Sequence, residues 1–330
     1  MRIQGKLLLI LLSMGCHAPI MQAQRRPADH QRVVKTPLVH DPVLAVQGDT
    51  CYLFFTGMGI PQMSTTDFEH WRFEHRVFKE APQWALQSVP GYRGHTWAPD
   101  VLYHQGRYHL FYSCSSFGKN ESAIGHAWRS TLTPDSPEPW HDTGEVIRSE
   151  KGDDYNAIDP CVVTDDDGVA WMAFGSFWGG IKMVQLDLSL TAPVQPVRLW
   201  SLSRRSTGGD KAVEAPFIYR HDGYYYLFVS FGYCCRGEKS TYRVVVGRAR
   251  QVTGPYLDRD GRDMMDGGGT PVISSTRRYV AVGHSAAYSI KGKDYFVAHG
   301  YPRQEDGASE LVCCEMAWDG QGWPLLQLND

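Results

Sequence analysis

The sequence has few segments with the apolar spacing of an amphipathic helix and, after its first residues, no apolar run long enough to span a membrane. It also lacks a cluster of basic residues, and its formal net charge of −3 gives no reason to expect a nucleic acid partner. The eight cysteines include no C-x-x-C spacing of the kind found in zinc sites. These absences favour a β-rich globular protein that neither crosses a membrane nor binds nucleic acid.

The first 23 residues have the pattern of an export signal. Basic residues precede the apolar run 7–12, which is too short to cross a bilayer. Two ends of the signal are compatible with the sequence: cleavage after Ala23, or a lipobox-like sequence that ends before Cys16 and would leave this cysteine lipidated. We therefore predict a secreted, periplasmic or cell-surface lipoprotein. Loss of Cys16 would leave an odd number of cysteines, which argues against a full disulfide framework.

A sequence phrase recurs five times within residues 30–330. Each copy starts with an acidic residue or a histidine, usually beside proline, and continues into a β-rich run, a polar turn with glycine and an aromatic strand. The copies start near His40, Trp97, Ile158, Glu214 and Gly283. This period predicts an all-β fold, a single five-bladed β-propeller with four-stranded blades. A β-sandwich would not explain why polar residues recur at the same phase.

Acidic residues stand at the expected starts of three innermost strands: Asp41, Asp159 and Glu214. His284 stands at the start of the fifth. In a propeller these starts converge on one central cavity, where neighbouring carboxylates acquire different pKa values. One ionised and one protonated carboxyl group are the pair that cleavage of a glycosidic bond requires.

Other residues of the repeats have simpler interpretations. Asp100 follows a proline and is interpreted as a structural group that bonds strand ends. The acidic run 165–168 is typical of a solvated hairpin turn rather than of a calcium loop. Cys51, Cys114 and Cys161 lie in strand-like runs, and we expect them to be buried as small apolar residues.

Several longer phrases occur in a fixed order along nearly the whole chain after the export signal. They include His40-Asp41-Pro42, Trp97-Ala98-Pro99-Asp100, Ser115-Ser116-Phe117-Gly118, Asn156-Ala157-Ile158-Asp159-Pro160, Gly175-Ser176-Phe177-Trp178-Gly179-Gly180-Ile181, Glu214-Ala215-Pro216, Cys234-Cys235-Arg236-Gly237 and Gly283-His284. In this order they resemble the arabinanases of glycoside hydrolase family 43, which are five-bladed β-propellers. The resemblance implies hydrolysis of α-1,5-arabinofuranosidic linkages in arabinan by a single inverting displacement.

The resemblance also implies roles for the carboxylates. Asp41 would be the general base that activates a water, Glu214 the general acid that protonates the leaving sugar oxygen, and Asp159 the group that tunes the pKa of Glu214 and orients it. In an inverting enzyme the base and the acid stand about 6.5–9.5 Å apart, which leaves room for the water.

The resemblance matches His284 to a histidine that faces an axial metal ion, usually calcium. We therefore expect one largely water-coordinated Ca²⁺ near His284 and no organic cofactor, although calcium prefers oxygen ligands. A hydrogen-bonded core histidine would fit the sequence equally well.

Aromatic residues provide candidate platforms for the flat faces of sugars. Phe117 matches the position at which similar enzymes stack the sugar at the cleavage site, and Trp178 lies in a similar loop-like context rich in glycine and serine. Core packing is the competing interpretation for each aromatic residue. Further candidates for substrate binding are His40, Trp97, Asn156 and Ser176.

Two features leave questions open. Relatives commonly carry His-x-Tyr-Asp after the fifth unit, whereas this chain has His299-Gly300-Tyr301-Pro302, which puts in doubt the contact of the missing aspartate and the closure of the last blade. The adjacent Cys234 and Cys235 match relatives, and either a vicinal disulfide or two thiols are compatible with export.

Three functional interpretations remain open at the level of sequence. We favour a monomeric endo-acting arabinanase that binds arabinan, the polysaccharide of pectic side chains. An exo-acting arabinanase, an arabinofuranosidase or a xylosidase would use the same fold, because loops alone decide whether one end of the cleft is blocked. A non-catalytic carbohydrate-binding propeller belongs to another class, but it has no need for an acid, a base and a modulator together.

Overall fold

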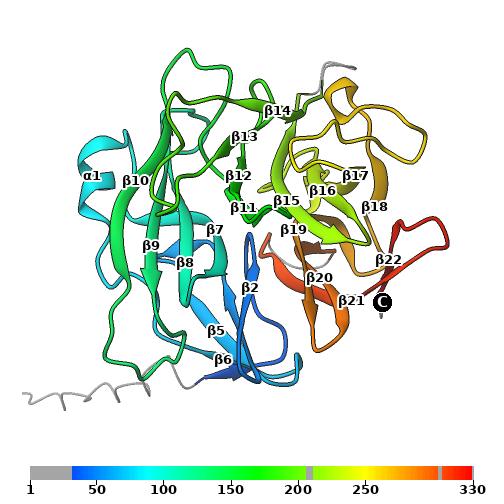
Figure 1. The fold of residues 1–330 in the computed structure, drawn as a ribbon. Coiled ribbons are helices and arrows are strands. Elements are labelled where there is room, and N and C mark those ends of the chain that lie inside the picture. Colours follow the sequence, from blue (N-terminus) through cyan, green and yellow to red (C-terminus); the bar gives the residue numbers. More distant parts are fainter. Residues whose placement is uncertain (1–31, 206–210, 304–306, 329–330) are drawn as a thin grey trace, which may run out of the picture.

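The computed structural model describes residues 32–205, 211–303 and 307–328. Their strands form five antiparallel sheets around a common centre, which is a five-bladed β-propeller (Figure 1). The predicted fold class is therefore confirmed. The predicted export signal lies outside the described residues. Across those three ranges, we find no helix with the length and apolar character needed to cross a bilayer.

Apart from β4, the strands of each blade follow one another along the chain. Blade 1 contains β1 (Val33–Val34), β2 (Val43–Gln47), β3 (Thr50–Phe54), β5 (Gln62–Thr65) and β6 (Trp71–Phe73). Blade 2 contains β4 (Gly57–Met58), β7 (His95–His104), β8 (Arg107–Cys114), β9 (Ser122–Arg129) and β10 (His141–Ser149). Blade 3 contains β11 (Cys161–Thr164), β12 (Ala170–Phe174), β13 (Ile181–Gln185) and β14 (Trp200–Ser203).

The last two blades have the predicted four strands. Blade 4 contains β15 (Val213–His221), β16 (Tyr224–Phe231), β17 (Arg243–Ala249) and β18 (Thr270–Ile273). Blade 5 contains β19 (Tyr279–Ile290), β20 (Lys293–Pro302), β21 (Glu310–Trp318) and β22 (Pro324–Gln327). Blades 1 and 2 have a fifth strand because the two-residue strands β1 and β4 add to them, a detail too short to produce a sequence pattern.

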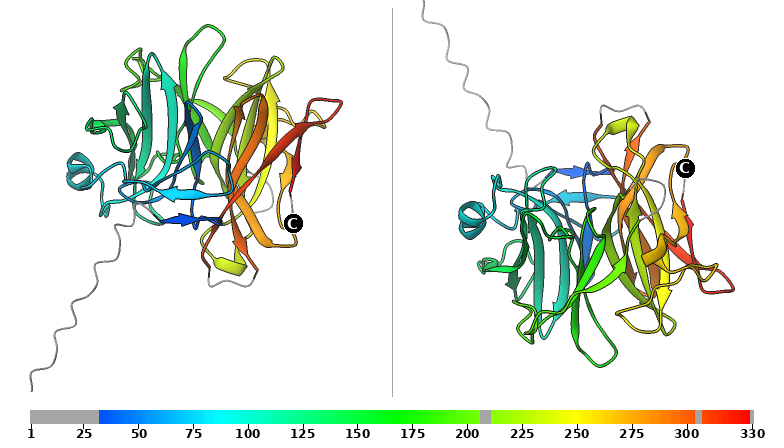
Figure 2. Two further views of the ribbon diagram at one scale, coloured as in Figure 1. Left: turned by 90° about the horizontal axis from the view of Figure 1, so that it is seen from below. Right: turned by 90° about the horizontal axis from the view of Figure 1, so that it is seen from above.

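Helical segments occur only in connections between the described strands. They are α1 (Gln83–Ser88), η2 (Gly237–Lys239) and η3 (Met264–Asp266). Figure 2 shows α1 at the outer rim of the propeller, where it lies beside β10. The centre is therefore built from strands alone, and β2, β7, β11, β15 and β19 surround it (Figure 1).

Tight turns join the first two strands of the blades. In blades 2, 4 and 5 both turn residues have positive φ: Gln105-Gly106, Asp222-Gly223 and Lys291-Gly292. This is the two-residue turn whose twist matches antiparallel strands, and it favours glycine because an L-residue is strained there. The turns lie at the ends of the strands far from the predicted carboxylates, so those carboxylates gather at the opposite end of the propeller.

Backbone hydrogen bonds close the ring between the first and last blades. The Val39 N–H donates to Ser309 O over 3.0 Å, and the Leu311 N–H donates to Pro37 O over 2.9 Å. Strand β20 continues to Pro302 and pairs with both β19 and β21. The last blade is therefore complete although Pro302 replaces the aspartate of the family pattern.

Apolar side chains of neighbouring blades fill the space between the sheets. Phe217 of blade 4 packs edge-on against Tyr288 of blade 5, with ring centroids 5.4 Å apart. Cys51, Cys114 and Cys161 are buried thiols, as the sequence predicted. Burial of such surface favours folding by about 25 cal/mol per Å², so the packed blades provide a stiff frame for the polar centre.

Candidate active site

Each blade has one residue with a left-handed backbone, just before its inner strand or at a register shift within that strand. These residues are Asp41 (φ 54°), Ala98 (φ 39°), Asp159 (φ 57°), Ala215 (φ 56°) and His284 (φ 51°). The conformation costs an L-residue about 1–2 kcal/mol and persists where the surrounding structure holds it. The strand register shifts at this point in blades 2, 4 and 5, which is the signature of a β-bulge. We call these five equivalent positions the hub positions.

The backbone N–H of every hub position donates to a side chain of the preceding blade. The acceptors are His299 Nδ1 for Asp41 (3.1 Å), Thr56 Oγ1 for Ala98 (2.8 Å), Ser113 Oγ for Asp159 (3.0 Å), Asp159 Oδ2 for Ala215 (3.2 Å) and Ser230 Oγ for His284 (2.8 Å). These bonds link all five blades. They compensate the strain of the bulges and fix the strand starts relative to one another.

The three predicted carboxylates do not share one phase of the repeat. Asp41 and Asp159 occupy hub positions together with His284, whereas Glu214 comes one residue earlier, next to the hub position of Ala215. The prediction of a common phase is therefore wrong for Glu214. The physical reason is the bulge, since neighbouring residues at a bulge can both be directed toward the centre.

Asp41 is a buried carboxylate held by three side chains. Its Oδ1 lies 2.7 Å from His40 Nδ1 and 2.9 Å from His284 Nδ1, and its Oδ2 accepts a hydrogen bond from Thr56 Oγ1 over 2.6 Å. Burial alone would raise the pKa of Asp41. The charges and hydrogen bonds of His284 and His40 outweigh that effect and hold this pKa well below its usual range, so Asp41 is ionised.

His299 lies beside Asp41 without forming an ion pair. Its Nδ1 is 3.6 Å from Asp41 Oδ1, but this nitrogen accepts the Asp41 N–H and therefore carries no proton. Burial lowers the pKa of His299 well below its usual range, which keeps the ring neutral. His299 is thus a structural acceptor that fixes the backbone of Asp41.

Glu214 is a buried carboxyl group with two hydroxyl donors. Ser176 Oγ donates to Oε2 over 2.6 Å, and the Tyr242 hydroxyl donates to Oε1 over 2.5 Å. Burial raises the pKa of Glu214 above its usual value, although both hydroxyl groups oppose this shift. The sequence analysis named Ser176 only as a candidate for substrate binding and gave no role to Tyr242, whereas the structure places both hydroxyl groups on Glu214.

Asp159 connects Glu214 to the hub. Its Oδ2 accepts the N–H of Ala215, the residue that follows Glu214. Burial, together with the negative charges of Glu214 and Asp41, raises the pKa of Asp159 to about 8 against the opposing charge of His284. The carboxyl groups therefore act on one another and belong to one site. This site combines an ionised Asp41 with two carboxyl groups whose pKa values are raised above their usual range.

The two aromatic residues favoured as sugar platforms are accessible. The side chain of Phe117 is 82% exposed, and that of Trp178 is 39% exposed. Burial in the core is therefore excluded for Phe117. Trp97 is half-buried and donates from Nε1 to His95 Nδ1 over 2.8 Å.

Asn156 is buried, and its Nδ2 donates to Lys119 O over 3.3 Å. Its Oδ1 has no hydrogen-bond partner within the described part of the chain. The side-chain amide of Asn156 therefore makes a structural hydrogen bond through its nitrogen, and its oxygen makes none to the described residues. The backbone contact to Lys119 places Asn156 beside the loop that carries Phe117.

Asp100 has the structural role that the sequence indicated. It is buried, and its Oδ2 accepts the N–H of Val162 in the next blade over 2.6 Å. Burial raises the pKa of Asp100 to about 7.

Sequence reasoning missed several groups that position the carboxylates. Thr56 bonds Asp41, Tyr242 bonds Glu214, and the Tyr301 hydroxyl lies 2.8 Å from His40 Nε2. Thr56 follows the second strand of blade 1, and Ser113 lies near the end of the second strand of blade 2; each accepts a hub N–H of the next blade. The recurrence of a hydroxyl residue at this point of the repeat could have identified Thr56 from the sequence.

His284 has the environment of a histidine that ligates an ion through one nitrogen. Its Nδ1 pairs with Asp41, which leaves Nε2 for a water or an ion, and a carboxylate behind a ligating histidine commonly fixes its orientation. Two groups of three candidate ligands are found among the described residues, and neither includes His284. An ion near His284 would therefore depend on water for its other ligands, and its binding would displace the proton that Asp41 favours on this ring.

Cys234 and Cys235 are two thiols beside His40 in this structure. Their Sγ atoms lie 2.7 Å apart, and Cys235 Sγ is 3.6 Å from His40 Nε2. The hydrogen bond from Cys234 lowers the pKa of the Cys235 thiol to about 5 despite burial, and His40 adds to this effect.

A separate hollow of about 610 Å³ lies between the hairpin turns of blades 4 and 5 and is lined in part by His221, Asp294 and Trp318. It contains none of the predicted site residues. The carboxylates gather at the opposite ends of the inner strands, so the chemistry belongs to that end of the propeller.

A five-bladed propeller with coupled, buried carboxyl groups at its hub defines a class of carbohydrate-cleaving enzyme. The description "Glycosyl hydrolases family 43" belongs to the family model that matches residues 30–324. The chain therefore belongs to glycosyl hydrolase family 43.

Curated relatives are similar over most of their length. The extracellular exo-α-(1→5)-L-arabinofuranosidase ArbA of Cellvibrio japonicus is 48% identical over 296 residues, 87% of this chain and 85% of the relative. The extracellular endo-α-(1→5)-L-arabinanase 1 of Bacillus subtilis is 40% identical over 291 residues, 87% of each chain. A solved structure of Cellvibrio cellulosa α-L-arabinanase complexed with arabinohexaose has a TM-score of 0.85 and 47% identity, covering 89% of this chain and 96% of that chain.

Proposed function

We propose that this protein hydrolyses α-1,5-arabinofuranosidic linkages in arabinan by a single displacement with inversion. Asp41 is the general base, Glu214 the general acid, and Asp159 the group that tunes and orients Glu214. The observation that carries this proposal is the geometry at the hub: two histidines bond Asp41, two hydroxyl groups bond Glu214, and Asp159 bonds the residue after Glu214. In agreement with these contacts, the pKa of Asp41 is held well below its usual range and that of Glu214 is raised. Groups with opposite shifts in one site are suited to the base and acid roles.

The contacts of Asp41 support its role as base. His40 and His284 bond one oxygen and Thr56 the other, so the carboxylate is oriented as well as ionised. A carboxylate in this state accepts a proton from an attacking water, whose oxygen then bonds to the anomeric carbon of the sugar.

The contacts of Glu214 support its role as acid. Burial raises the pKa of Glu214 and so favours its protonated form, and the hydroxyl groups of Ser176 and Tyr242 stabilise the negative charge when the proton moves to the leaving sugar oxygen. The link from Asp159 to the Ala215 N–H fixes the backbone beside Glu214. Asp159 therefore acts through Glu214 in this scheme.

Exposed aromatic rings complete the scheme for substrate binding. Phe117 and Trp178 offer accessible faces for stacking of arabinofuranose units, and His40, Trp97, Asn156 and Ser176 line the path between them and the carboxylates in our proposal. The relative crystallised with arabinohexaose supports a chain of linked sugars as the ligand.

The endo mode remains our first candidate for the position of cleavage, and the endo-acting Bacillus subtilis relative supports it. The exo mode is the second candidate, because the 48% identical Cellvibrio japonicus relative carries an exo name. Chromatography of early products from linear arabinan separates the two: an endo enzyme releases a range of oligomers, whereas an exo enzyme releases one short product.

Substitution of the acid provides the main test. Glu214→Gln keeps the side-chain size but cannot donate the proton, so we expect turnover of linear arabinan to fall by roughly 10²–10⁴-fold while binding persists. Asp166→Asn, in an exposed hairpin turn, serves as the control and should retain wild-type turnover. Wild-type turnover in Glu214→Gln would refute the assignment. Branched arabinan, xylan and an aryl arabinofuranoside complete the substrate panel.

We further propose a hydrated Ca²⁺ near His284, which would add positive charge beside the carboxylates when bound. Calorimetric titration of chelator-treated protein with Ca²⁺ tests this, and His284→Ala, which offers no ligand atom, should lose the binding heat. An unchanged heat in that variant would exclude His284 as the ligand.

Export and a monomeric state also remain proposals. The extracellular names of the relatives support export, and membrane fractionation together with mass determination of the mature N-terminus would distinguish cleavage after Ala23 from lipidation at Cys16. The molar mass of the purified protein, measured by light scattering, tests the monomeric state.

A further inference from the structure

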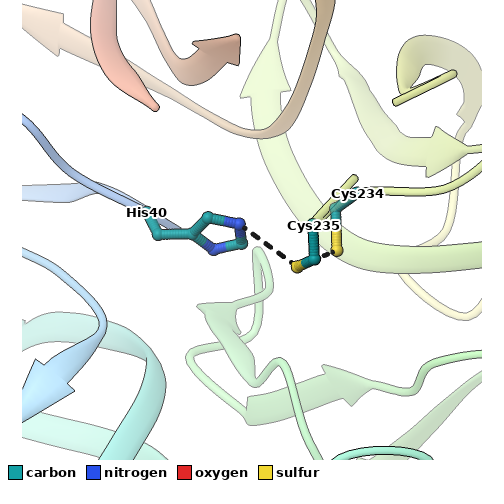
Figure 3. Close-up of side chains that lie close together, drawn as sticks. All are labelled: His40, Cys234 and Cys235. Atoms are coloured by element: carbon teal, nitrogen blue, oxygen red, sulfur yellow. Dashed lines mark hydrogen bonds between the residues drawn. The ribbon is translucent and has the colours of Figure 1, made fainter. Parts of the chain in front are cut away.

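Three soft ligand atoms meet at the edge of the active site. His40 precedes β2 in blade 1, and Cys234 and Cys235 follow β16 in blade 4. Figure 3 shows the His40 ring directed toward Cys235, with Cys234 behind it. One nitrogen of His40 and the two sulfur atoms all lie within 4.8 Å of one another.

We propose that His40, Cys234 and Cys235 bind a thiophilic metal cation such as Zn²⁺, and that its binding inhibits the enzyme. Thiolate sulfur and imidazole nitrogen bind Zn²⁺ at about 2.3 Å and about 2.0 Å, so small movements bring these atoms into tetrahedral spacing. Cys235 is exposed, which lets the ion enter from solvent and keep a water as its fourth ligand. All three ligands bind in their deprotonated forms: Cys234 and His40 each release a proton on binding, whereas the lowered pKa of Cys235 already favours its thiolate.

The backbone lets two adjacent cysteines reach one ion. Successive side chains of an extended strand point to opposite faces, so neighbouring thiols usually diverge. Cys235 instead has a left-handed backbone with φ of 61°, and the two sulfur atoms lie 2.7 Å apart. The Cys235 N–H donates to the Tyr301 hydroxyl over 2.9 Å, which holds this conformation in place.

His40 is already oriented as a metal ligand. Its Nδ1 lies 2.7 Å from Asp41 Oδ1, so the carboxylate supports the ring from behind while Nε2 faces the sulfur atoms. A carboxylate behind a ligating histidine strengthens and orients metal binding. This site differs from the one proposed at His284, because it offers sulfur and nitrogen, which suit Zn²⁺ better than Ca²⁺.

Metal binding would act directly on the proposed base. The cation takes His40 Nε2 from its hydrogen bond with the Tyr301 hydroxyl and ties the ring that bonds Asp41 to the two sulfur atoms. The two thiolates balance the charge of the ion, so the inhibition follows from the bound ion occupying the edge of the site and from the altered hydrogen bonds around Asp41. The inhibitory part of this inference therefore rests on the proposed function.

The chain contains a matched control in a second adjacent pair, Cys313 and Cys314. This pair lies within the regular strand β21, where Cys313 is opposite Val297 and Cys314 is opposite Phe296. Their side chains therefore point to opposite faces and cannot bind one ion together.

Titration with Cd²⁺ and Zn²⁺ tests the site in fully reduced protein whose thiols have been counted. We expect one ion per chain by calorimetry and a sulfur-to-cadmium charge-transfer band in the ultraviolet. The double variant Cys234→Ser/Cys235→Ser should bind at least about tenfold more weakly and lose the band, because a hydroxyl group is a poor ligand for a soft ion. Cys313→Ser/Cys314→Ser should behave as wild type.

Arabinan hydrolysis measured in the same titration tests the inhibition. Wild type and the Cys313→Ser/Cys314→Ser variant should lose activity as the site fills, and Cys234→Ser/Cys235→Ser should resist. Equal metal affinity in the two double variants, or no binding to reduced wild type, overturns the site. Full activity in the metal-bound wild type overturns the inhibitory role. Metal binding is measured by calorimetry and ultraviolet absorption without any substrate. A failure to hydrolyse arabinan would therefore refute the proposed function and leave the metal site standing.

Discussion

Removal of the Tyr242 hydroxyl should move the alkaline limb of the pH–rate profile to higher pH. Burial raises the pKa of Glu214, and the hydrogen bonds from Ser176 and Tyr242 oppose that rise. A hydrogen bond to a charged group contributes about 1.5–3 kcal/mol, and one pKa unit corresponds to about 1.4 kcal/mol. Tyr242→Phe removes one such bond and should raise the pKa of Glu214 by about 1–2 units.

The sign follows from the proposed role of Glu214 as the acid. An acid with a higher pKa keeps its proton to higher pH, so activity should persist further into the alkaline range even if maximal turnover falls. Glu214 and Asp159 influence each other, so the alkaline limb reports an apparent pKa of the two carboxyl groups together. The measurement is kcat/KM on linear arabinan as a function of pH.

Tyr256→Phe is the matched control for this experiment. Tyr256 is also fully buried, but its hydroxyl donates to Val252 O over 2.7 Å rather than to a carboxylate. Its loss should cost about 1 kcal/mol of unfolding free energy and leave the pH profile unchanged. The reasoning fails if a folded Tyr242→Phe enzyme keeps the wild-type alkaline limb, or if both variants shift it equally.

Three further variants test separate parts of the site. Thr56→Val removes the hydroxyl group that donates to Asp41 and accepts the Ala98 N–H. We expect kcat to fall and the free energy of unfolding, measured in urea, to decrease by about 1–3 kcal/mol. An unchanged free energy of unfolding would contradict a stabilising role for the hub bonds. Phe117→Ala should raise KM for arabinan without lowering Tm, since this residue is 82% exposed. A lowered Tm with unchanged kinetics would show that Phe117 stabilises the fold and does not bind substrate. Asp100 has a folded-state pKa of about 7, above its unfolded value, so its stability contribution is lost as pH rises from about 4 to about 7. Asp100→Asn should therefore flatten the decline of stability over that range while hydrolysis continues, and an unaltered slope would show that Asp100 does not titrate there.

The recurring phrase was sufficient to predict the fold because each copy carries its own strand and turn signals. Alternation, glycine turns and aromatic strands act over a few residues, so they can be recognised without knowledge of the ring. The acidic residues could be singled out for the same reason, since Asp41, Asp159 and Glu214 stand at the starts of inner strands. The one-residue offset of Glu214 is also present in the sequence, because proline follows Asp41 and Asp159 directly but follows Glu214 only after Ala215. Only the structure shows that this offset is a bulge held by a hydrogen bond to another blade.

The sequence by itself determined the strand pattern, the number of blades and the acidic residues that converge at their starts. Only the tertiary structure decided which side chains set the charge of those residues. Tyr242 is joined to Glu214, and Cys235 lies beside His40 at a separation of 195 positions. The physical reason is range: secondary structure follows from neighbouring residues, whereas a pKa depends on burial and on charges that come together when the ring closes.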